Sequence, residues 1–107
     1  MRFLVEVSFP TEAGNRALQD PKFLEKLEHG LKSLNAEASY FCEKDGERTA
    51  NIVVSFANPD MIPVVAEPFF QDFGARVKLY PVMLLDDLKR GVAQWQALAR
   101  KEQPVIQ

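Results

Sequence analysis

The chain has 107 residues, of which 47% are hydrophobic and 26% are charged, and its formal net charge is −2. These values are typical of one ordinary globular domain and argue against a disordered chain. A protein that binds nucleic acid is expected to carry a basic stripe that neutralises phosphates, and the acidic balance of this chain argues against one.

The single cysteine, Cys42, excludes an internal disulfide and fits a reducing compartment. The N-terminal residues alternate in polarity instead of forming the apolar segment of a signal peptide. No apolar run approaches the roughly 18 residues of a membrane-spanning helix. We therefore expect a cytoplasmic protein without membrane or nucleic-acid partners.

The first predicted strand covers residues 2–9, where two sets of side chains alternate between opposite faces. Pro10 ends this strand. Residues 11–19 are expected to form a weak helix or turn, because Gly14 and Asn15 favour irregular structure. Asp20 and Pro21 suit the N-cap and the first position of a helix, and an apolar stripe at helical spacing continues that helix to about Leu34.

Two further strands are predicted at about residues 37–43 and 48–56, joined by a turn in which Asp-Gly supplies the positive φ. A second helix is expected to begin after Pro59 and to end at Gly74, and Pro68 inside it predicts a kink or a restart. The last strand covers about 76–82. A closing helix of roughly 15 residues is then predicted from Asp86, with a loose tail at 102–107.

This order of elements predicts one α+β domain over residues 1–107. It is expected to be a ferredoxin-like βαββαβ sandwich, with a four-stranded antiparallel sheet in the order 4-1-3-2 plus a C-terminal helix. The helices are expected to cover one face of the sheet, which carries Phe3, Val5, Val7, Ile52, Val54, Phe56, Val77 and Leu79.

The opposite face of the predicted sheet mixes polar and apolar side chains. It carries Leu4, Glu6, Ser8, Thr49, Asn51, Val53, Ser55, Lys78 and Tyr80. This face can be solvated, as one face of an antiparallel sheet often is, or it can pack against the same face of a second copy. We favour the homodimer, because Leu4, Val53, Tyr80 and Val82 are many apolar groups to leave in water. In that interface Glu6 is expected to pair with Lys78.

No motif in the chain indicates a metal or a cofactor, and none is expected. His29 is predicted to point away from the apolar stripe of its helix into solvent, and one histidine with one cysteine is too few ligands for zinc. Cys42 is predicted to be a buried, inert thiol. The glycine-rich and nucleophile motifs of nucleotide-binding proteins and hydrolases are absent from the sequence.

Two groups of residues are candidates for a ligand site. Glu67 precedes Pro68, Phe69 and Phe70, and a carboxylate in such an apolar setting can serve as a general acid or base. The alternative is a solvated Glu67 beside phenylalanines that belong to the core. Arg48 is a candidate anion clamp, with Asn15 and Tyr40 as orienting groups, whereas the alternative for Arg48 is a solvated cation.

Several stretches resemble a family of small, uncharacterised bacterial proteins of the ferredoxin-like, dimeric α/β-barrel superfamily. They are Phe9-Pro10-Thr11-Glu12-Ala13-Gly14-Asn15, Gly46-Glu47-Arg48-Thr49, Ile62-Pro63-Val64-Val65-Ala66-Glu67-Pro68-Phe69-Phe70 and Tyr80-Pro81-Val82-Met83. The superfamily includes cofactor-free monooxygenases, muconolactone-isomerase-like enzymes, haem-handling proteins and amino-acid-sensing domains. The resemblance implies a homodimer with two sheets face to face and a pocket between sheet and helices, without implying a reaction.

Three functions stay open at this point, the third of which is a regulatory sensor domain. The first is a homodimeric module that binds a small molecule or a partner without catalysis, which the missing catalytic constellation favours. The second is a cofactor-independent enzyme, similar to a monooxygenase or an isomerase, that acts on a small, apolar, oxygenated compound. In the second case Glu67 would transfer the proton and Arg48 would hold the anion.

Overall fold

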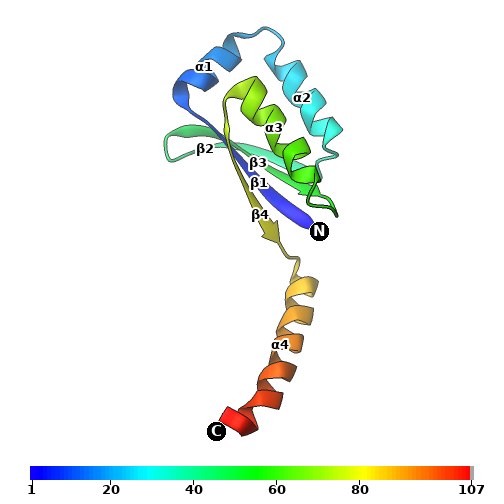
Figure 1. Ribbon diagram of the computed structural model, residues 1–107. Coiled ribbons are helices and arrows are strands. Elements are labelled where there is room, and N and C mark those ends of the chain that lie inside the picture. The colour runs from blue at the N-terminus through cyan, green and yellow to red at the C-terminus, as the bar shows by residue number, and fades with distance from the viewer. Residues whose placement is uncertain (107) are drawn as a thin grey trace.

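The computed structural model describes residues 1–106, and the side chains of residues 1–101, as four strands and four helices (Figure 1). In chain order these are β1 (Arg2–Phe9), α1 (Thr11–Gln19), α2 (Phe23–Ser33), β2 (Ala38–Lys44), β3 (Glu47–Ser55), α3 (Met61–Phe73), β4 (Arg76–Val82) and α4 (Leu85–Ile106). The predicted α+β class and the predicted order of elements are confirmed.

The four strands form one antiparallel sheet in the order β2-β3-β1-β4, which is the predicted order 4-1-3-2 seen from its other edge. Val5 at the centre of β1 stands opposite Ile52 of β3 and Leu79 of β4. Because side chains alternate along a strand, this register places all three on one face. That face carries the core, as the sequence predicts, and Phe3, Phe56, Val77 and Leu79 pack around it.

The helices α1, α2 and α3 lie together on this face of the sheet (Figure 1). Their contributions to the core differ. Helix α3 buries Val65, Ala66 and Phe69, and α1 buries Ala13 and Gly14, whereas α2 has no fully buried residue. The layer is therefore tightly packed beneath α3 and loosely packed beneath α2.

One predicted helix boundary is wrong and one is confirmed. Helix α2 begins at Phe23 with Lys22 at its N-cap, so Asp20 and Pro21 are not its N-cap and first residue. The Asp20 carboxylate instead accepts a hydrogen bond from the backbone N–H of Lys22 at 2.9 Å in the turn before the helix. Gly74 ends α3 in the left-handed conformation at φ 59°, and its N–H donates to the Phe70 carbonyl at 3.0 Å.

Two helices are more continuous than their sequences favour. Residues 11–19 form a helix, which is one of the two predicted possibilities, despite Gly14 and Asn15. Helix α3 continues through Pro68, so the predicted restart does not occur. In both cases tertiary packing outweighs the local preference. Val65, Ala66 and Phe69 hold α3 against the sheet on either side of the proline.

Helix α4 projects from the body of the molecule as an extension of β4 (Figure 1). The molecule measures 65 × 28 × 22 Å, and its radius of gyration of 18.7 Å exceeds the roughly 13 Å of a compact domain of this length. Trp95 is 65% exposed, so it does not pack against its own domain. At 22 residues α4 is longer than predicted, and the side chains of the predicted loose tail at 102–107 lie outside the described residues.

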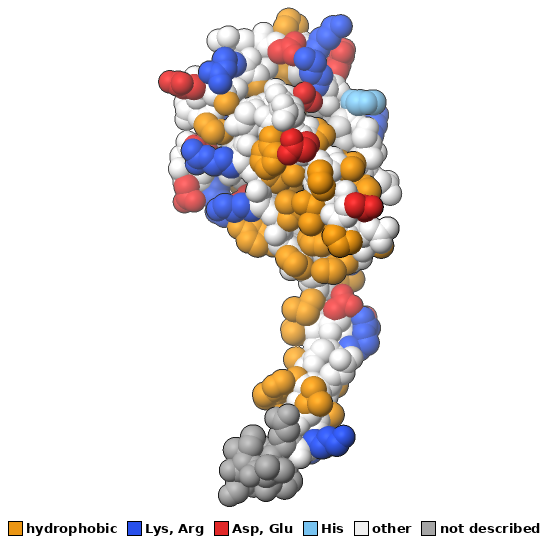
Figure 2. Space-filling model, in the orientation of Figure 1, with side chains coloured by type: hydrophobic (Ala, Val, Ile, Leu, Met, Phe, Trp, Pro, Cys, Tyr) orange, Lys and Arg blue, Asp and Glu red, His pale blue; other side chains and the backbone are white. Residues whose placement is uncertain are grey.

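Apolar side chains gather over the lower half of the body and along α4 (Figure 2). On α4 they recur at alternating spacings of three and four, at Leu85, Leu88, Val92, Trp95 and Ala99. All except Ala99 are exposed. A second exposed apolar group lies on α3 and comprises Met61, Ile62, Val64 and Phe70.

Candidate functional site

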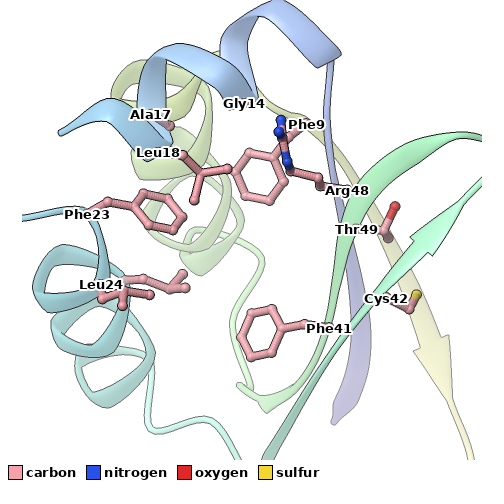
Figure 3. Close-up of a pocket in the computed structure, with 11 residues that line it drawn as sticks. Phe9, Gly14, Ala17, Leu18, Phe23, Leu24, Phe41, Cys42, Arg48 and Thr49 are labelled. Atoms are coloured by element: carbon pink, nitrogen blue, oxygen red, sulfur yellow. The ribbon is translucent and has the colours of Figure 1, made fainter. Parts of the chain in front are cut away.

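A cavity of about 390 Å³ lies where α1 and α2 approach β2 and β3. Figure 3 shows the side chains of Phe9, Leu18, Phe23, Leu24 and Phe41 arranged around it. The lining is completed by Gly14, Ala17, Leu27, Cys42, Arg48 and Thr49. The polar atoms of Cys42 and Thr49 point away from the cavity toward the other side of the sheet (Figure 3), so the walls are almost wholly apolar.

Arg48 is the one charged residue among those that line this cavity in the described part of the chain. Its Nη2 donates a hydrogen bond to Asn15 Oδ1 on α1 at 2.9 Å. Gly14 makes room for this side chain, because a Cβ at that position would lie 2.5 Å from Arg48 Nη1. The close approach of α1 to β3 thus depends on a glycine in the helix interior.

The structure joins two of the residues predicted from sequence, Asn15 and Arg48, and both are exposed, which agrees with the alternative of a solvated Arg48. Phe69 is buried, which agrees with the alternative that the phenylalanines beside Glu67 belong to the core. Glu67 and Phe70 are exposed on α3, and Glu67 accepts a hydrogen bond from Gln71 Nε2 at 3.1 Å within that helix. Tyr40 stands opposite Asn51 on the other face of the sheet. Glu67 and Tyr40 therefore do not line the cavity beside Arg48.

Two predictions about single residues have opposite outcomes. Cys42 is exposed, so its predicted burial is wrong, because β2 is an edge strand and the side chain faces the uncovered side of the sheet. His29 is exposed, as predicted, and it lines a groove of about 710 Å³ between α2 and α3.

At the centre of the uncovered face of the sheet, the negative charge of Glu6 is paired with lysine side chains. Glu6 is only 6% exposed, and its Oε1 accepts a hydrogen bond from Lys44 Nζ at 2.5 Å. Lys78 Nζ lies 3.9 Å from the other carboxylate oxygen, so the predicted proximity of Glu6 and Lys78 is confirmed. The hydrogen bond from Lys44 lowers the pKa of Glu6 below its ordinary 4.5, and the charges of both lysines add to this effect, while burial opposes it.

We expect the stability contributed by Glu6 to depend on pH. A depressed folded-state pKa stabilises the protein above the unfolded value, and the gain is lost as pH falls through the folded value. Glu6→Gln should therefore lower the urea midpoint at neutral pH, and its difference from wild type should shrink below about pH 4.5. Glu12→Gln, at an exposed position on α1, is the control. A Glu6→Gln difference that stays constant into acid would contradict the assignment.

Among the described residues, no group of three or more histidine, cysteine, aspartate or glutamate side chains is placed to hold a metal ion. Within the same part of the chain, no helix combines the length and apolarity required to cross a membrane.

The sequence matches no family model and no curated protein. Among solved structures, the de novo designed protein Ferredog-Diesel is similar over 76% of this chain and 85% of its own length, at 18% sequence identity and a TM-score of 0.42. This similarity is too distant to bear on the site, so the residues themselves carry the functional interpretation.

Proposed function

We propose that the protein is a homodimeric module that binds a small molecule, built as a ferredoxin-like, dimeric α/β barrel. Two copies bury their uncovered sheet faces against each other, and each α4 packs on the partner. The observation that carries the proposal is the amount of apolar surface that one chain leaves exposed on the uncovered face and on α4.

The uncovered face supports this arrangement by its composition. Leu4, Val53, Tyr80 and Val82 are half-buried or exposed around Glu6, and Tyr80 is 43% exposed. Burying a charge in an interface is costly unless it is paired. Because Lys44 and Lys78 of the same chain pair with Glu6, this face can lose its water without leaving an unpaired carboxylate.

Helix α4 extends the same surface. It starts at Leu85, shortly after Val82 of the uncovered face. The alternating spacing of three and four along its apolar stripe is the pattern of a helix that packs against another element along one seam. In a two-fold dimer the same surface of each copy meets its equivalent, so sheet and helix become buried in one closed assembly.

Tyr80→Glu tests the interface. A carboxylate at this position would be desolvated in the dimer, so we expect light scattering to show a monomer. Gln19→Glu places the same charge on the exposed surface of α1, outside the cavity and the uncovered sheet face, and should leave the dimer intact. If Val64→Glu separates the subunits and Tyr80→Glu does not, the exposed face of α3 is the interface and the sheet-to-sheet arrangement is wrong.

A further inference from the structure

We propose that the cavity between α1, α2, β2 and β3 binds a single-chain amphiphile with an anionic head, and that Arg48 holds the head. This inference rests on the proposed small-molecule function and names the ligand class. The cavity lies on the helix-covered side of the sheet, away from the surface assigned to the dimer.

The apolar walls of the cavity indicate that the body of the ligand is apolar. The side chains that surround the cavity in Figure 3 are aliphatic or aromatic, and they offer no polar atom for orienting a polar body. Its volume of about 390 Å³ falls within the range of roughly 300–1,000 Å³ found for small-molecule sites. Leu24 and Phe41 stand at the cavity with 72% and 57% of their surfaces exposed, and an apolar chain between them would remove this surface from water.

The guanidinium of Arg48 indicates that the head group of the ligand is anionic. This guanidinium is held by a neutral amide, Asn15, and among the described residues it forms no ion pair, although Glu43 is the cross-strand neighbour of Arg48. A guanidinium has five donors in a planar fork, and the contact with Asn15 uses one of them. The remaining donors, and a positive charge that forms no ion pair among the described residues, suit an anionic group at the end of an apolar chain.

The position of Arg48 is fixed from two sides. Asn15 holds the guanidinium by its hydrogen bond, and Gly14 leaves the space that the guanidinium occupies. Arg48 Cδ also lies 3.6 Å from the point where a Gly14 Cβ would stand, so the aliphatic stem runs along α1. The positive charge therefore stands beside the apolar walls, as recognition of an amphiphile requires.

Titration calorimetry on the full chain tests the proposal with three probes of one chain length, the two ionic probes below their micelle concentrations and the alcohol below its solubility limit. They are decanoate, decanol and decyltrimethylammonium. We expect decanoate to bind once per chain, at least about tenfold more tightly than the other two. Arg48→Met should remove this preference while decanol binding persists. Arg76→Met removes an exposed arginine that is ion-paired with Glu47 and should change nothing.

Gly14→Ala provides a variant that keeps the charge. The new methyl group would displace the Arg48 guanidinium, so decanoate affinity should fall by less than in Arg48→Met. Equal binding of decanoate and decanol, or an Arg48→Met variant that binds decanoate like wild type, overturns the assigned head group. If none of the probes binds a protein that is dimeric in native mass spectrometry, the amphiphile proposal fails and the dimer stands.

Discussion

Replacing Ile52 by alanine should destabilise the protein by about 2–5 kcal/mol, a large part of the roughly 5–15 kcal/mol available to a domain. Ile52 has no exposed surface and stands opposite Val5 at the centre of the core. Truncation removes its buried methyl and methylene groups and leaves a cavity that the paired strands cannot fill by moving.

Urea unfolding at one fixed protein concentration measures this effect, because the stability of a dimer depends on concentration. Val64→Ala makes a similar truncation at an exposed position of α3 and should change the free energy of unfolding by no more than about 0.5 kcal/mol. Equal losses in the two variants would contradict the assignment of Ile52 to the centre of the core.

The fluorescence of Trp95 should shift to longer wavelength when the protein is diluted through dimer dissociation. Trp95 is the one tryptophan of the chain and is largely exposed in a single copy, so any burial must come from a partner. We expect a blue-shifted maximum in concentrated solution and the maximum of a solvated indole in dilute solution.

The Tyr80→Glu variant is the control for this signal. Its α4 is unchanged, and it should show the maximum of a solvated indole at every concentration. A wild-type maximum that is already that of a solvated indole in concentrated solution would remove α4 from the proposed interface.

The sheet could be predicted because the alternation in residues 2–9 and 48–56 is strong and one face of each strand is apolar apart from Arg48 at the start of the second. This alternation predicts Val5 and Ile52 on the same face, and the structure places them opposite each other. It also predicts Glu6 beside Lys78, although Lys44, which reaches Glu6 from β2, was not anticipated. Cys42 was misjudged because being next to aromatic residues in sequence does not reveal that β2 is an edge strand.

One residue that lines the candidate cavity, and its hydrogen-bond partner, could be selected from the sequence. Arg48 and Asn15 were selected from the sequence, and the structure joins them by a hydrogen bond. The apolar lining was missed because Leu18, Phe23 and Phe41 come from three elements that have no common sequence motif. The alternation of β2 does place Phe41 on the face of Ala50, and this signal could have indicated the cavity.

The position of α4 could not be predicted, because an apolar stripe identifies the buried side of a helix without identifying what buries it. The regularity of α1 also depends on a tertiary contact that the sequence alone does not reveal. Gly14 weakens a helix in isolation, but here it accommodates Arg48 from another strand.

Native mass spectrometry of the wild-type protein tests the homodimer most directly. The proposed assembly predicts a species of twice the chain mass of 12.1 kDa at micromolar concentration, converting to monomer in Tyr80→Glu. A wild-type protein that is monomeric under these conditions would contradict the burial of the uncovered sheet face and of α4 by a second copy.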